Sequence, residues 1–257
     1  MDQPVLILGA LREEIAEIRG KMLVEDQFKV GHGDVWSGTW ENRSIALVRT
    51  GVGKKCANKV LEDVLRKIEP SLILSTGYAG GLSRDLNVGD LVVADRVLDV
   101  STKSFSGEEL SVAAPDRQWL DQVKGLSPPG RFSIHYGTLL TVSEIVANSS
   151  AKLQLGSRRG ALAVDMETSV LLTGAGEKNI PFLSIRAISD TADQSLADVS
   201  SLVGEDGAVS KLKAGWYVVT HPQTIPHFIS LRQQSQKATR NLTDFIRTLL
   251  QAPDFNR

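Results

Sequence analysis

Residues 72–81 read LILSTGYAGG, an apolar run that leads into a glycine-rich segment. A short, continuous apolar run that ends in glycine is typical of a strand buried on both faces, as in the parallel sheets of α/β proteins. We therefore predict a strand over residues 72–76 and a loop over residues 77–81. Residues 4–10 (PVLILGA) have the same pattern, and residues 182–188 form another apolar run. All three are expected to be strands of one sheet.

Predicted helices alternate with the predicted strands. Residues 11–22 repeat apolar side chains at the spacing of an amphipathic helix. The other predicted helices cover residues 54–68, 116–123, 165–177 and 226–251, and the other predicted strands cover residues 35–40, 43–49, 90–100, 137–142 and 162–164. The alternation predicts an α/β fold with a central, twisted, mixed and mostly parallel β-sheet flanked by helices. Because no linker or repeat divides the chain, we predict a single domain over residues 1–257, with residues 203–225 as an excursion before the last helix.

The composition excludes several classes of protein. The chain has 257 residues, 42% of them hydrophobic and 23% charged, and its formal net charge is -1. This charge gives no general attraction to nucleic acid or to an anionic membrane. The single cysteine, Cys56, excludes an intrachain disulfide. The sequence has no apolar run long enough to span a membrane and no recognisable secretion signal. We expect a cytoplasmic protein that binds neither nucleic acid nor a membrane.

The common cofactor and metal motifs are missing from the sequence. Gly51 and Gly53 begin a dinucleotide fingerprint, but Cys56 stands at the position of its third glycine. There is no phosphate-binding P-loop and no Gly-x-Ser-x-Gly segment. The four histidines do not have the spacing of zinc ligands. We therefore expect neither a metal nor an organic cofactor.

Acids and glycines gather where predicted strands end. They lie in residues 9–14, 75–81, 164–167 and 186–190. Open α/β sheets bind their ligands at the carboxyl ends of strands, so these segments are expected to meet in one site. Each acidic pair also has a structural interpretation, since acids are favoured as helix caps and in the first turn of a helix.

In this order the segments resemble the nucleoside phosphorylase and nucleosidase superfamily, and most of all its 5′-methylthioadenosine/S-adenosylhomocysteine nucleosidases. Six motifs over about residues 5–195 carry the resemblance: Leu8-Gly-Ala10 with Arg12-Glu-Glu14, Thr50-Gly-Val-Gly-Lys54, Thr76-Gly-Tyr-Ala-Gly-Gly81, Val88-Gly-Asp-Leu-Val-Val93, Val164-Asp-Met-Glu167, and Ile180-Pro-Phe182 with Arg186 to Asp193. The resemblance implies a nucleoside phosphorylase-like fold and a small-molecule nucleoside substrate. It also implies a homodimer whose partner subunit completes the pocket for the 5′ group.

The resemblance implies catalytic roles for three residues. Asp190 is expected to protonate purine N7 as a general acid, Glu14 to take a proton from water, and Arg186 to place Glu167 or the water. Glu167 would bind the ribose hydroxyls, and Met166 would pack against the sugar. The remaining expected substrate contacts are Tyr78, Ala79, Gly80, Ile145, Val146 and Ser189.

A carboxylic acid at position 190 favours a 6-aminopurine, because it can protonate N7 and accept from the exocyclic amine. Three residues depart from the family pattern. Tyr78 replaces a small residue, and its phenol could close a phosphate pocket or bond the nucleophile. Asp165 replaces the first Glu of a Glu-Met-Glu triplet. Ile145 replaces an aromatic residue that stacks on the purine.

Three functions remain open from the sequence. The first is hydrolysis of an adenine nucleoside, for which Glu14 supplies the base. The second is phosphorolysis by the same fold, with an adenosylhopane-type substrate included, for which Arg12 and Arg49 could supply an anion pocket. The third is a non-catalytic nucleoside-binding module. The acids Glu14, Glu167 and Asp190 argue against the third, since binding alone does not need an acid and a base.

Overall fold

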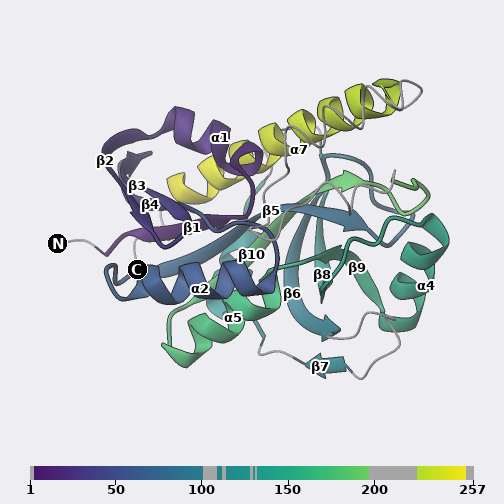
Figure 1. The fold of residues 1–257 in the computed structure, drawn as a ribbon, viewed down its shortest axis with the longest axis horizontal. Coiled ribbons are helices and arrows are strands. Elements are labelled where there is room, and N and C mark those ends of the chain that lie inside the picture. The colour runs from purple at the N-terminus through teal and green to yellow at the C-terminus, as the bar shows by residue number, and fades with distance from the viewer. Residues whose placement is uncertain are drawn as a thin grey trace.

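The computed structural model describes residues 3–100, 109–111, 114–127, 130, 132–196 and 225–252. One ten-stranded sheet runs through these residues in the order β10-β6-β8-β9-β5-β1-β4-β3-β2, with β7 beside β6 (Figure 1). The strands are β1 (Val5–Gly9), β2 (Leu23–Val30), β3 (Gly33–Trp40), β4 (Arg43–Arg49), β5 (Leu72–Gly81), β6 (Leu91–Val100), β7 (Glu109–Ser111), β8 (Ile134–Val142), β9 (Ala161–Asp165) and β10 (Phe182–Asp190).

Part of the sheet closes into a barrel. Strand β10 pairs with β6 on one edge and with β5 on the other, so β5, β10, β6, β8 and β9 form a closed five-stranded ring. The predicted mixed sheet flanked by helices is confirmed, but the sheet is not mostly parallel and part of it closes into a barrel, which the sequence did not predict. Among the described strands, five pairings are parallel and five are antiparallel. Closure depends on a pairing between distant strands, and no local sequence pattern encodes it.

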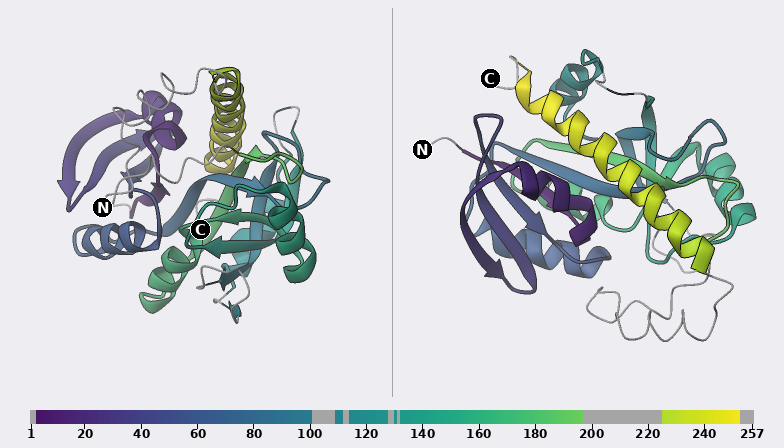
Figure 2. Two further views of the ribbon diagram at one scale, coloured as in Figure 1. Left: turned by 45° about the vertical axis from the view of Figure 1, so that its right-hand side comes forward. Right: turned by 90° about the horizontal axis from the view of Figure 1, so that it is seen from above.

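Helices cover both faces of the sheet. They are α1 (Arg12–Lys21), α2 (Lys54–Leu65), α3 (Arg117–Lys124), α4 (Ser149–Arg159), α5 (Thr168–Glu177) and α7 (Ile225–Gln251). Helices α2 and α5 pack against each other, whereas α7 contacts α1, β5 and β10 along another side of the molecule (Figure 2). On β1, Ile7 belongs to the core under α1 and α7, while Leu6 and Leu8 belong to the core under α2 and α5. This double burial explains why β1 is apolar at every position.

Most of the predicted elements are confirmed, but several bounds differ. Strand β5 continues through residues 77–81, where a loop was predicted, and the helix predicted from residue 165 begins at Thr168. Strands β2 and β7 and helix α4 were missed. The β2 side chains are mostly exposed, so they lack the apolar pattern of a buried strand. The excursion predicted over residues 203–225 falls almost wholly outside the described residues.

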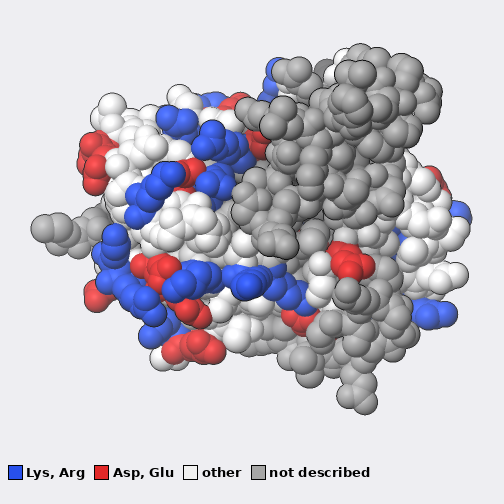
Figure 3. Space-filling model, viewed as in Figure 1, with Lys and Arg blue, Asp and Glu red and all other residues white. Residues whose placement is uncertain are grey.

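The surface carries charges of both signs. In the view of Figure 3, Lys and Arg side chains form a band along α2, with acidic side chains between them. On this helix Asp63 pairs with Lys59 and Arg66, each at 2.9 Å. Such exposed pairs add little to stability. No helix among the described residues is long and apolar enough to cross a membrane.

Candidate active site

Glu14 is a buried carboxylate at the start of α1, with a side chain that turns back toward the chain before the helix. Its Oε2 accepts hydrogen bonds from the backbone N–H groups of Ala10 (2.7 Å) and Leu11 (2.8 Å), and its Oε1 accepts from that of Tyr78 on β5 (2.8 Å). Leu11 is the N-cap of α1 and Glu14 is its N3 residue, so the bond to Leu11 is the one that an N3 Glu makes in a capping box. Burial raises the pKa of Glu14, and the backbone bonds and Arg186 oppose this shift. The result is a fixed carboxylate of increased basicity.

The close contact between Glu14 and β5 requires a glycine. A Cβ atom at Gly77 would lie 2.6 Å from Glu14 Oε1, well inside van der Waals contact. The glycine-rich segment after Thr76 therefore serves to admit a carboxylate beside the strand.

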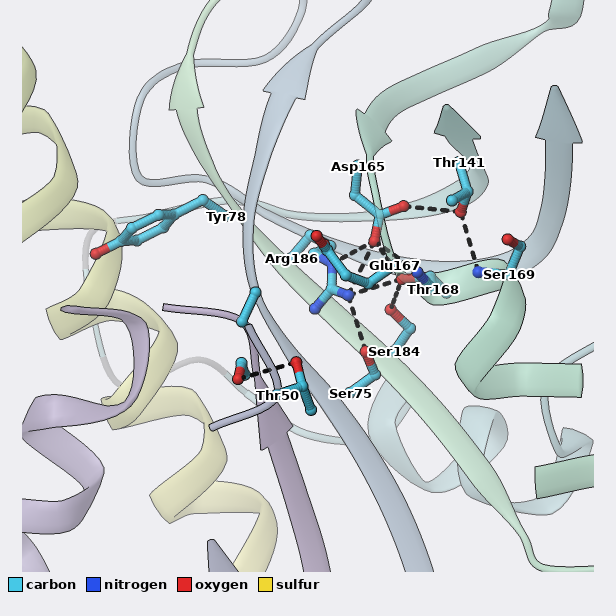
Figure 4. Close-up of polar contacts among 12 residues, drawn as sticks. Thr50, Ser75, Tyr78, Thr141, Asp165, Glu167, Thr168, Ser169, Ser184 and Arg186 are labelled. Atoms are coloured by element: carbon cyan, nitrogen blue, oxygen red, sulfur yellow. Dashed lines mark hydrogen bonds and ion pairs between the residues drawn. The ribbon is translucent and has the colours of Figure 1, made fainter. Parts of the chain in front are cut away.

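Arg186 on β10 is buried, and three side chains fix its guanidinium (Figure 4). Its Nε donates to Asp165 Oδ2 (2.9 Å), and its Nη2 donates to Ser75 Oγ (2.8 Å) and Thr168 Oγ1 (2.7 Å). Within the described part of the chain, Nη1 has no hydrogen-bond partner. The guanidinium is thus held rigidly with one donor nitrogen unused.

Asp165 and Glu167 flank Arg186 but have different partners. The Asp165 carboxylate accepts from Arg186 and from Thr141 Oγ1 (2.8 Å), so it anchors the guanidinium. Glu167 Oε1 accepts from the backbone N–H of Gly53 (2.7 Å). Burial, followed by repulsion from Asp165, raises the pKa of Glu167 to about 8. Glu167 is therefore a weak acid that holds its proton near neutral pH.

Glu14, Glu167 and Arg186 line one small cavity. Its wall is completed by the ends of β1 and β4, by β5 and by α5, through Leu8, Gly9, Ala10, Thr50, Ser75, Thr76 and Leu171. The buried hydroxyl of Thr76 has no hydrogen-bond partner among the described residues. Sequence reasoning missed this hydroxyl as a separate site group, although it directly precedes the glycine-rich segment. The cavity thus brings together three of the predicted site residues, from three distant parts of the chain.

Asp190 lies at the end of β10 and is not among the residues that line this cavity. It is buried beside Gly80, whereas Glu14 sits beside Gly77. Gly77 and Gly80 are three residues apart on β5, and three residues of a strand span about 10 Å. The two carboxylates therefore lie against points of β5 that are roughly 10 Å apart. The Asp190 side chain accepts from Ser189 Oγ (2.6 Å) at Oδ1 and forms an ion pair with Lys152 through Oδ2. No sequence motif singled out Lys152, which lies in the first turn of α4.

Comparison with known proteins places the chain in a family. A family model described as the phosphorylase superfamily matches residues 4–214. The chain belongs to the phosphorylase superfamily.

Within this superfamily the chain is 25% identical over 196 residues to the 5′-methylthioadenosine/S-adenosylhomocysteine nucleosidase of Staphylococcus aureus, with 73% of this chain and 86% of that protein covered. The Neisseria meningitidis nucleosidase of the same name, in complex with methylthio-immucillin-A, aligns with a TM-score of 0.72 at 19% identity, covering 97% of this chain and 99% of that one. The Helicobacter pylori futalosine hydrolase aligns with a TM-score of 0.73 at 20% identity, covering 96% and 97%. These structures share the fold of this chain.

The residues that depart from the superfamily pattern have defined positions. The Tyr78 phenol points toward α7 (Figure 4) and forms a 2.5 Å hydrogen bond with Thr239 Oγ1, so it does not serve Glu14. The suggestion that the phenol bonds the nucleophile is therefore not supported; the backbone N–H of Tyr78 contacts Glu14 instead. Ile145 is 38% exposed, whereas Val146 belongs to a third buried core, against which the partly buried Met166 packs. Ser189 Oγ lies 3.3 Å from the carbonyl of Ala79.

Proposed function

We propose that this chain is a purine nucleosidase. It hydrolyses the N-glycosidic bond of an adenine nucleoside of the 5′-methylthioadenosine/S-adenosylhomocysteine type, which gives free adenine and a ribose derivative. The similarity to nucleosidases of that name supports the substrate class. We also propose that the protein is a cytoplasmic homodimer. Light scattering can test the dimer by measuring the molar mass in solution.

One observation carries the choice of water as the nucleophile. Three backbone N–H groups converge beside Arg186, an arrangement suited to an anion, and the Glu14 carboxylate already occupies them. A phosphate would have to displace this carboxylate or lie against its charge. The two cations that could have held phosphate are engaged elsewhere, since Arg49 bonds Asp34 at 2.8 Å and Arg12 lies 3.7 Å from the same carboxylate. The site therefore favours a base for water over a pocket for phosphate.

The proposed reaction uses the two acids beside β5, Glu14 next to Gly77 and Asp190 next to Gly80. Glu14 takes a proton from water as the water oxygen bonds to the anomeric carbon. The unused donor of Arg186 and the hydroxyl of Thr76 are suited to hold that oxygen. For this step Asp190 starts in its protonated form. The bond between the sugar and purine N9 breaks, its electron pair moves into the base, and Asp190 gives its proton to N7. Each such acid or base typically contributes about 10²–10⁴-fold to the rate.

The deciding assay measures adenine release by the purified chain. Methylthioadenosine, S-adenosylhomocysteine and adenosine are each supplied with and without phosphate. We expect adenine from at least one of them in phosphate-free buffer. Release only with phosphate would identify a phosphorylase, and no release with retained nucleoside binding would identify a binding module.

Replacing Glu14 by Gln removes the base and keeps one amide oxygen, which can accept from the backbone N–H groups of Ala10 and Leu11 but leaves that of Tyr78 without its acceptor. Turnover should fall about 10²–10⁴-fold. Glu13 is an exposed acid in the same helical turn, so Glu13→Gln is the matched control and should leave turnover unchanged. Equal rates for the two variants would remove Glu14 from the mechanism.

Replacing Asp190 by Asn tests the general acid. The amide has nearly the same shape but no proton acidic enough to transfer to N7. We expect turnover to fall about 10²–10⁴-fold while adenine binding changes much less. An Asn variant that stays fully active would assign protonation of the purine to another group.

A further inference from the structure

Lys152 is a fully buried lysine whose ammonium group, among the described residues, bonds to a single segment of the chain. It is 0% exposed. Its ammonium donates to Asp190 Oδ2, to the carbonyl of Thr191 (3.1 Å) and to the carbonyl of Gln194 (2.8 Å). A lysine ammonium has three N–H donors, so these bonds use all of them. All three donors of the ammonium group therefore bond to the segment from Asp190 to Gln194.

Burying the Lys152 ammonium costs free energy unless an opposite charge compensates it. Lysine is almost never fully buried without a partner, and a buried carboxylate also needs a compensating charge. Lys152 and Asp190 provide this compensation for each other.

The same contacts join two walls of the proposed purine site. Helix α4, which carries Lys152, follows directly after Ile145 and Val146, the residues expected to pack on the base. The segment after Asp190 is tied to the start of this helix by two more bonds. The N–H of Leu196 donates to the carbonyl of Ala147 (2.9 Å), and the N–H of Ser149 donates to Ser195 Oγ (3.2 Å). Lys152 lies at the centre of this connection.

We propose that Lys152 is the positioning residue for Asp190 in the reaction. Its ammonium fixes the carboxyl group beside the purine and stabilises the carboxylate that forms as the proton moves to N7. Because the developing charge on Asp190 appears in the transition state, the effect is expected mainly on kcat. This inference rests on the proposed function, and Lys152 itself is not expected to touch the substrate.

The test compares variants of Lys152 with a control on the same helix. Lys152→Met keeps the length of the side chain but removes the charge, and kcat for adenine release should fall about 10²-fold with a smaller change in KM. Leu155 is a buried residue of α4, and Leu155→Ala is the control for lost stability alone. It should lower Tm but leave kcat near that of the parent. Equal losses of kcat in these two variants would overturn the inference.

Two further variants make the test decisive. Lys152→Arg keeps the charge, so it should fold even where Lys152→Met does not, and its larger head should displace Asp190 and lower kcat about tenfold. A parental kcat in Lys152→Arg would overturn the inference. In an Asp190→Asn background, Lys152→Met should cause no further loss, because the lysine acts through the carboxyl group. If the unchanged chain releases no adenine, the proposed function fails; if it does and Lys152→Met matches Leu155→Ala, only this inference fails.

Discussion

Replacing Glu167 by Gln should stabilise the protein, and more so as the pH rises. Glu167 is 9% exposed, and its burial together with Asp165 raises its pKa from 4.5 to about 8. Between these two values the folded protein keeps a proton that the unfolded chain has lost. Stability therefore falls as the pH rises through this window. Gln does not titrate, and its carbonyl oxygen can still accept the hydrogen bond from Gly53.

The size of the effect follows from the two pKa values. The cost of keeping Glu167 in the fold is about 1 kcal/mol at pH 5, about 3 kcal/mol at pH 7 and about 5 kcal/mol at pH 9. Glu167→Gln removes this pH-dependent cost. Its gain in the free energy of unfolding should thus be about 2 kcal/mol larger at pH 7 than at pH 5, which corresponds to roughly 4–8 °C in Tm for a chain of this size.

Urea unfolding followed by tryptophan fluorescence at the three pH values measures this gain. Glu177 is exposed on the same helix, and Glu177→Gln should stay within about 0.5 kcal/mol of the parent throughout. A gain that does not change with pH would refute the assignment of the cost to a buried titrating carboxyl. The stabilised variant should also turn over more slowly, because Gln keeps its carbonyl oxygen on Gly53 and offers the ribose an NH2 group, which cannot accept a hydrogen bond.

Two further substitutions test the contacts around β5. Gly77→Ala should displace the Glu14 carboxylate, because the new Cβ would lie 2.6 Å from Oε1, and adenine release should fall strongly; Gly176→Ala, in open space on α5, should leave it unchanged. Tyr78→Phe should lower the free energy of unfolding by about 0.5–1.5 kcal/mol through the lost bond to Thr239, as measured by urea unfolding. Its turnover should match that of the parent, and a large loss would instead give the phenol a part in the reaction.

Much of the fold was predictable because buried strands and helices have recognisable apolar patterns over a few neighbouring residues. The apolar runs of β1, β5 and β10 indicate strands covered on both faces. The helical spacing of apolar side chains in residues 11–22 indicates a helix with one buried face. The acids that follow these strands were also visible, and three of the predicted site residues do line one cavity. The exposed strand β2 was missed because exposure removes the apolar pattern on which the prediction depends.

The sequence by itself determined which segments are buried and which acids stand at strand ends, since both depend on residues a few positions apart. The tertiary structure decided which groups meet. It closed the barrel through β10, brought the N–H of Tyr78 to Glu14 across 64 positions, and set Lys152 against Asp190 across 38. These contacts depend on the path of the whole chain, and hydrogen bonds and ion pairs act only at short range. The partner of a buried charge is therefore fixed only when the chain has folded.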